Sequence, residues 1–74
     1  MGGLSRVFGL ARPEFGDAKS PSDEYCHFLD GSCTYTHESG ESIEIEPDTL
    51  VFFPLGWRGT CDIRRTVRKI YMIR

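Results

Sequence analysis

The chain has 74 residues, which is enough for one domain, and we expect that domain to span residues 1–74. A domain this small buries only roughly 60% of the surface that its unfolded chain exposes, so each element must contribute to one shared core. The formal net charge of −2 is unlike the basic balance of nucleic-acid-binding domains, and the lack of a long apolar run excludes a membrane-spanning helix.

The start of the sequence and its thiols both predict a cytoplasmic protein. No basic stretch followed by an apolar run occurs near the N-terminus, so no secretory signal is predicted. The cysteine count is odd and no pair has C-x-x-C spacing, which argues against a disulfide framework and against a zinc knuckle. We therefore expect reduced thiols at Cys26, Cys33 and Cys61.

Charge is unevenly distributed along the chain. Ten of the eleven acidic residues lie between Glu14 and Asp48, whereas six basic residues lie between Arg58 and Arg74. A basic segment of this kind is compatible with nucleic-acid binding, but no recognition module accompanies it. Antiparallel pairing of acidic with basic strands explains the same asymmetry, and we favour this interpretation.

Short apolar runs bounded by turn residues recur from the N-terminal end onward, a pattern typical of β-strands. Residues 7–11 form the first predicted strand. Residues 15–23 are rich in Gly, Ser and Pro and are predicted to form a loop. The strand pattern resumes at residues 24–29.

The next signal is the pair Asp30-Gly31, which predicts a hairpin. Both central positions of a type I′ turn require positive φ, which Asp tolerates and Gly adopts freely. Residues 33–36 are then the return strand. A second turn is predicted at residues 38–41.

Four further strands are predicted after this turn. Residues 42–46 alternate strictly between polar and apolar, so Ile43 and Ile45 should point inward. Residues 50–53 form a continuous apolar run, which favours a strand covered on both faces and the most buried segment of the chain.

The chain ends in two predicted strands, at residues 60–63 and 67–73, joined by a basic corner at residues 64–65. Short strands at regular spacing are typical of a β-sandwich or β-barrel.

Four segments carry a resemblance to a known family. Residues 24–31 (EYCHFLDG) place a glutamate and a glycine with six residues between them, and residues 52–56 (FFPLG) place Pro-x-Gly after an apolar strand. WRGT follows at residues 57–60, and residues 67–71 (VRKIY) place a lysine two residues before a tyrosine. In this order they resemble the cupins, in particular the small cupins that include (S)-ureidoglycine aminohydrolase and the ethanolamine-utilisation cupin domains.

The resemblance implies an all-β fold, a small cupin-like β-barrel or jelly-roll sandwich. It also implies N-terminal shortening, because such cupins have a further strand or two before the segment equivalent to residues 7–10. A small barrel with an uncovered sheet edge is expected to form a homodimer, by strand exchange or by packing face to face.

Metal-binding cupins use two histidines just before the motif glutamate and a third after Pro-x-Gly. The corresponding positions here are residues 17–20 (DAKS) and Gly59, so Glu24 is the only family ligand present. One carboxylate does not hold a catalytic metal, which needs about three protein ligands. We therefore expect no metal and no other cofactor.

The resemblance places Glu24 inside the barrel, and strand alternation then turns Cys26 inward as well. It suggests Lys69 as the cation beside Glu24, with Tyr71 on the same face. Trp57 follows the Pro-x-Gly turn, where its ring would form one wall of a pocket.

Each of these residues also has a purely structural interpretation. Glu24 and Lys69 would form a buried ion pair, or the lysine stem would pack on apolar surface. Trp57 would plug the barrel, and Cys26 would be a small core residue. The sequence is compatible with two functions. The favoured one is a domain without a metal that binds a small polar or anionic molecule, or serves as a dimeric structural module, with no nucleic-acid or membrane partner. The alternative is an enzyme acting on a small carbon–nitrogen substrate, with Glu24 as general acid or base.

Overall fold

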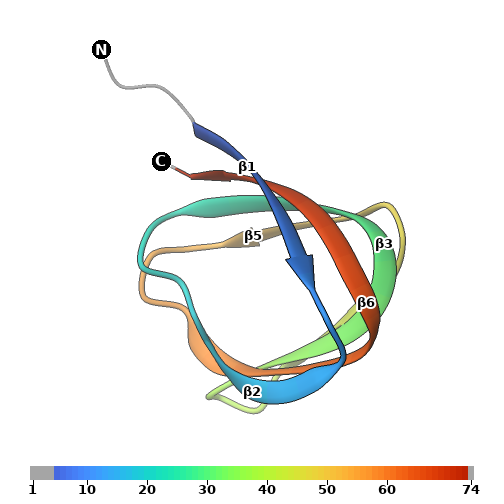
Figure 1. Cartoon of the computed structure of the whole chain (residues 1–74). Helices are drawn as coiled ribbons and strands as arrows, with labels where there is room; N and C mark the ends of the chain where they lie inside the picture. The colour runs from blue at the N-terminus through green and yellow to red at the C-terminus, as the bar shows by residue number, and fades with distance from the viewer. Residues whose placement is uncertain (1–4, 74) are drawn as a thin grey trace.

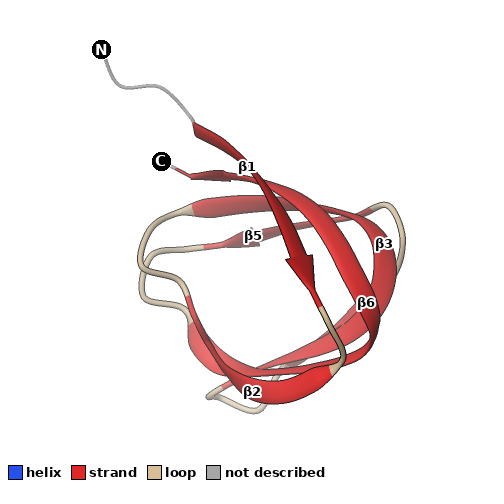
Figure 2. Ribbon diagram, in the orientation of Figure 1, coloured by secondary structure: helices blue, strands red, loops and turns tan. Residues whose placement is uncertain are grey.

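The computed structural model describes residues 5–73, and all regular structure in that range is β-strand (Figure 2). Every strand pairing is antiparallel, which confirms the predicted all-β class. No helix in this range is long and apolar enough to cross a membrane. The strands are β1 (Ser5–Ala11), β2 (Glu14–Lys19), β3 (Glu24–His37), β4 (Ser42–Ile45), β5 (Thr49–Phe53) and β6 (Arg58–Ile73).

The two longest strands, β3 and β6, form the frame of the molecule. They pair with each other from Glu24 opposite Ile73 to His37 opposite Gly59. In one half of the molecule the strand order is β1-β6-β3-β5, and in the other half it is β2-β6-β3-β4. We call these the β1/β5 half and the β2/β4 half. Figure 1 shows the strands curling around a common interior, as predicted for a small barrel.

The strand β3 passes straight through the site of the predicted hairpin. The chain does not reverse at Asp30 and Gly31. Instead, the register against β6 shifts between Phe28 and Cys33, as at a β-bulge. Gly31 has a φ of 94°, and a Cβ atom there would overlap the carbonyl oxygen of Thr66. The hairpin prediction is wrong because a glycine with positive φ serves a bulge as well as a turn.

The predicted loop at residues 15–23 is also wrong over most of its length. The strand β2 occupies Glu14–Lys19 and pairs with β6. Alternation gives the inner face of β2 to Gly16 and Ala18, which are too small to produce an apolar signal, while the large Phe15 is 71% exposed. This strand therefore lacks the apolar alternation that predicts a strand, because its inward residues are small.

The predicted break in the last strand does not exist either. The strand β6 is continuous through residues 64–65, where it lies beside the bulged part of β3. The side chains of Arg64 and Arg65 are exposed, and the strand continues through both residues. A basic pair in a strand is tolerated here because both side chains reach solvent.

Only one face of β5 packs against the interior of the barrel. The prediction that the strand at residues 50–53 is covered on both faces is therefore wrong. Phe53 is buried and Val51 packs on the core. Leu50 is 76% exposed and Phe52 is 45% exposed. The apolar run thus has two outward members, and it is not the most buried segment of the chain.

Side chains from both halves meet in one core. On β4, Ile45 is fully buried and Ile43 packs against the core, which confirms the predicted alternation. The buried apolar residues are Cys26, Phe28, Cys33, Tyr35, Ile45, Phe53, Ile63 and Val67.

Pairing of acidic with basic strands is confirmed on the surface. A nitrogen of Arg64 lies 2.9 Å from a carboxylate oxygen of Glu44, and a nitrogen of Arg68 lies 3.9 Å from one of Asp30. The basic C-terminal strand therefore meets the acidic middle of the chain in the fold itself.

Candidate functional site

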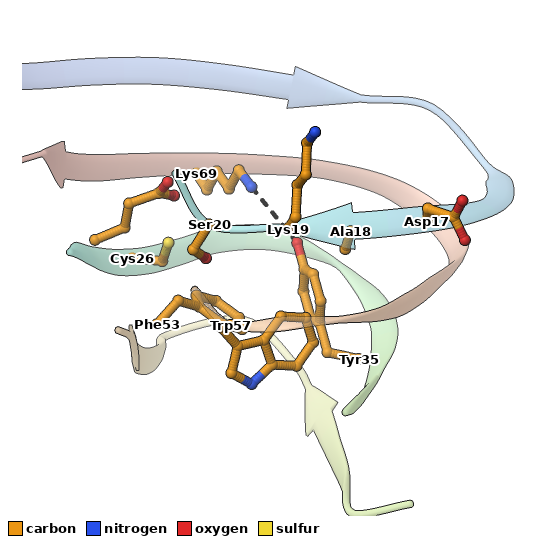
Figure 3. Close-up of a pocket in the computed structure, with 10 residues that line it drawn as sticks. Asp17, Ala18, Lys19, Ser20, Cys26, Tyr35, Phe53, Trp57 and Lys69 are labelled. Carbon is orange, nitrogen blue, oxygen red and sulfur yellow. Dashed lines mark hydrogen bonds between the residues drawn. The ribbon is translucent and has the colours of Figure 1, made fainter. Parts of the chain in front are cut away.

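A cavity of about 320 Å³ opens into the barrel between β2, β3, β5 and β6 (Figure 3). Strand alternation decides which side chains reach it. Ala18 and Ser20 point inward from β2 and the residue after it, whereas Asp17 and Lys19 extend away from the centre of the cavity. Ser20 is buried, with 6% of its surface exposed. We call this cavity the barrel pocket.

Lys69 supplies a positive charge to the barrel pocket. Its ammonium lies 3.5 Å from the hydroxyl of Tyr35, a contact drawn in Figure 3. The same nitrogen lies 5.5 Å from the ring centre of Phe28 and 5.3 Å from that of Tyr71. Aromatic faces attract a cation within about 6 Å, so the rings of Phe28 and Tyr71 attract the Lys69 ammonium.

A glycine on β1 makes room for this arrangement. Gly9 is the partner of Lys69 in the β1–β6 ladder. A Cβ atom at Gly9 would lie 3.1 Å from the ring of Tyr71 and 3.3 Å from the side chain of Lys69. The lysine stem and the tyrosine ring therefore pack directly beneath the backbone of β1.

The opposite wall of the barrel pocket is aromatic. The ring centres of Tyr35 and Phe53 are 4.9 Å apart, and the ring of Trp57 meets Phe53 edge to face at 5.0 Å. Tyr35 and Trp57 are also in edge contact, at 5.9 Å. Such edge-to-face packing fixes the rings and presents an apolar surface to the cavity.

The turn before β6 holds Trp57 in place. The N–H of Ser20 donates a hydrogen bond of 2.9 Å to the carbonyl of Trp57, and the N–H of Gly56 donates one of 2.9 Å to the carbonyl of Ser20. Gly56 has a φ of 88°, which a glycine adopts without strain. The Pro-x-Gly turn therefore ties the aromatic wall to the end of β2.

Four of the five residues predicted for the site line the barrel pocket: Glu24, Cys26, Trp57 and Lys69. Tyr71 does not line it and instead lies beneath the ammonium of Lys69. In the described range no ion pair joins Glu24 to Lys69. Both side chains face the cavity, but the lysine interacts with aromatic groups in place of the carboxylate.

Six residues that line the pocket were not predicted as pocket residues from the sequence: Asp17, Ala18, Lys19, Ser20, Tyr35 and Phe53. Ser20 fell in the predicted loop. Tyr35 was assigned to a return strand whose inner face could not be set without knowing the bulge at Gly31. Phe53 belongs to an apolar run in which no alternation was visible. Had residues 24–37 been predicted as one strand with a bulge at Gly31, Tyr35 would have been placed on the inner face with Cys26 and Phe28.

The thiols inside the barrel differ in acidity. Burial raises the pKa of Cys26, while the nearby charge of Lys69 opposes this effect. The pKa of Cys61 is lowered to about 7, because the side chain of Cys33 donates toward its sulfur and Tyr35 does so to a smaller extent. The same interaction raises the pKa of Cys33.

The residues present do not fit the metal that the cupin fold commonly carries. The resemblance assigns the first two histidines to positions around Ala18 and Ser20, and neither residue supplies an imidazole. No side chain fits at Gly59 without movement of the backbone, because a Cβ atom there would overlap the carbonyl oxygen of Thr36. Within residues 5–73, no group of three or more His, Cys, Asp or Glu side chains is placed to hold an ion.

Known proteins match this chain in sequence and in fold. The sequence model of a family described as "EutQ-like cupin domain" matches residues 12–71. None of the curated proteins matches the sequence at a significant level.

Several solved structures share the fold. A DUF861 family protein from Thermotoga maritima is 29% identical with a TM-score of 0.88, over 92% of this chain and 77% of that one. A putative ethanolamine utilization protein Q from Salmonella typhimurium is 23% identical with a TM-score of 0.81, over 95% of this chain and 56% of that one. The EutQ protein of Clostridium difficile is 20% identical with a TM-score of 0.83, over 95% of this chain and 55% of that one.

The chain thus spans little more than half the length of the two EutQ proteins. It contains the four segments that carry the resemblance, all of which lie within or overlap the matched residues 12–71. Its strand arrangement is that of the solved cupins. The chain belongs to the EutQ-like cupin domain family.

Proposed function

We propose that the domain binds a small polar or anionic molecule in the barrel pocket, with Lys69 as the group that holds its negatively charged or carbonyl oxygen. The observation that carries this proposal is the half-buried ammonium of Lys69, which faces the cavity and lacks a carboxylate partner among the described residues. A charge in such a place is costly to bury unless something pairs with it. An anionic ligand would provide that pairing.

The remaining walls indicate the kind of molecule that fits. Phe53 and Trp57 offer an apolar surface, which suits a short carbon skeleton or a planar group. Glu24 offers carboxylate oxygens, which suit a hydrogen-bond donor on the ligand. A cavity of about 320 Å³ lies at the small end of the range for ligand sites, so the ligand is a small metabolite-sized compound.

A thermal-shift panel of small carboxylates, phosphates and amides tests this proposal, followed by calorimetry on each hit. A compound at about 100 times its Kd adds about 2.7 kcal/mol of stability, which is roughly 10–20 °C in Tm for a domain of this size. Lys69→Met should abolish the shift. Lys19→Met is the matched control, because Lys19 lies at the rim with its ammonium directed away, and it should retain the shift (Figure 3).

A panel without any Lys69-dependent shift would contradict the proposal. Equal losses in the two lysine variants would also contradict it, because they would indicate a general attraction of anions to the surface.

Catalysis by Glu24 is the second candidate, favoured by the position of Glu24 in the same cavity as Lys69. If the bound molecule is a carbon–nitrogen substrate, Glu24→Gln should remove turnover and leave most of the binding intact, because the amide keeps the shape but not the proton transfer. Turnover that survives in Glu24→Gln would exclude this role.

A further inference from the structure

The barrel pocket contains two charges of opposite sign that do not pair with each other. Four charged residues line it, but Asp17 and Lys19 extend away from its centre (Figure 3). Lys69 and Glu24 are the other two, and no ion pair joins them among residues 5–73. A partly buried charge without a partner is costly. A ligand that pairs only with Lys69 therefore leaves the carboxylate of Glu24 unpaired in the same cavity.

The register of β3 against β6 separates the two charged residues along the barrel. Lys69 is opposite Phe28, whereas Glu24 is opposite Ile73, four residues farther along β6. At about 3.4 Å per residue, this offset places the two Cα atoms roughly 13 Å apart along the strands. A ligand in the cavity therefore meets the ammonium and the carboxylate at different ends.

A short side chain lies between the two charges. Cys26 is two residues from Glu24 on β3, and both line the barrel pocket. Burial raises the pKa of the Cys26 thiol, the charge of Lys69 lowers it and the charge of Glu24 raises it, so the thiol lies close to both groups. The middle of this wall is therefore small and uncharged, which suits the carbon chain of a ligand.

The ammonium of Lys69 retains hydrogen-bond donors for a ligand. An ammonium has three N–H donors. One is directed at the hydroxyl of Tyr35, 3.5 Å away, and this is the only side-chain hydrogen bond of Lys69 within the described residues. The remaining donors suit the two oxygens of a carboxylate. Glu24 offers only acceptors when it is ionised, and these suit an ammonium group.

We propose that the barrel pocket selects a short ω-amino acid, with its carboxylate at Lys69 and its ammonium at Glu24. This inference rests on the proposed function, because it requires that Lys69 binds the anionic group. The ligand carries one charge of each sign and so pairs with both charges of the pocket, which a simple acid or a simple amine does not. Two or three methylene groups hold its charges apart, as the register of the two strands requires.

Calorimetric titration of the full chain with matched probes tests this proposal. The pairs are β-alanine with propionate, γ-aminobutyrate with butyrate, and glycine with acetate. The two longer amino acids should each bind at least about 10-fold more tightly than the matched acid, the effect of one hydrogen-bonded charge pair. Glycine should gain less from its amino group, because both of its charges lie next to one carbon atom.

Two carboxylate variants identify the group that recognises the nitrogen. Glu24→Leu should abolish the advantage of the amino acids over the acids. Asp17→Leu is the matched control and should retain the advantage, since Asp17 extends away from the centre of the cavity (Figure 3). Circular dichroism and a cooperative melt establish that each variant is folded, and Glu24→Met serves if Glu24→Leu is not.

Lys69→Met separates the failure of this inference from the failure of the proposed function. It should abolish the binding of acids and amino acids alike, and probes that bind independently of Lys69 would contradict both proposals. Lys69-dependent binding in which an acid equals its amino acid, or in which the advantage survives in Glu24→Leu, would overturn only the selection of an ω-amino acid. Tightest binding of glycine, or no binding of any amino acid, would overturn that selection as well.

Discussion

At the residue scale, the charge of Lys69 is the feature that gives the barrel pocket its chemistry. Its nitrogen is held by three aromatic groups, at Phe28, Tyr35 and Tyr71. The sequence pattern of a lysine two residues before a tyrosine predicted that both side chains would share the inner face. It did not predict that the lysine would interact with rings instead of with Glu24. Phe28 and Tyr35 lie on β3, and the inward position of Tyr35 depends on the bulge.

The acidity of Cys61 gives a second prediction at this scale. Its pKa of about 7 means that the thiolate predominates above neutral pH, whereas the buried Cys26 and Cys33 have raised pKa values. Cys61 should therefore be the first thiol alkylated by iodoacetamide, with a rate that rises through pH 7 and levels off above pH 8 or so. Peptide mass spectrometry over a pH series measures this order. A midpoint near 9, or earlier labelling of Cys26, would contradict it.

At the scale of elements, the bulge in β3 decides how the sheet closes. Gly31 combines a φ of 94° with the close approach of Thr66. Gly31→Ala should destabilise the domain by about 3 kcal/mol or more, because it adds a steric overlap with backbone to the strain of positive φ. Urea unfolding with a common m-value measures the loss.

Gly40 provides the comparison for Gly31. Its φ is 102°, but nothing lies within 4 Å of an added Cβ atom. Gly40→Ala should therefore cost only about 1–2 kcal/mol, the strain of the left-handed backbone alone. Similar losses in the two variants would mean that the close approach at Gly31 contributes nothing.

The sequence predicted elements well where alternation was visible and poorly where it was not. Residues 42–46 alternate strictly, and the structure has β4 there with Ile45 buried. The strand β2 escaped detection because its inner face is made of Gly16 and Ala18. Asp30-Gly31 was misread because the same residues serve a hairpin and a bulge, and only the long-range pairing of β3 with β6 distinguishes them.

At the scale of the whole molecule, the family motifs predicted the fold although several strands were misplaced. The segments at 24–31 and 52–56 are characteristic of the family fold and do not depend on the position of any single strand. They therefore predicted the fold correctly although the hairpin and loop predictions were wrong. The homodimer expected from the sequence remains a prediction.

If Lys69 makes the barrel pocket a site for a small polar or anionic molecule, as we propose, the single tryptophan of the chain allows a direct measurement. Trp57 lines the pocket, so its fluorescence reports occupancy in the unlabelled protein. Titration with each hit of the metabolite panel should give a saturable change in the wild type and in Lys19→Met, and none in Lys69→Met. A change that persists in Lys69→Met, or a wild type whose Trp57 responds to no compound that binds, would contradict the claim.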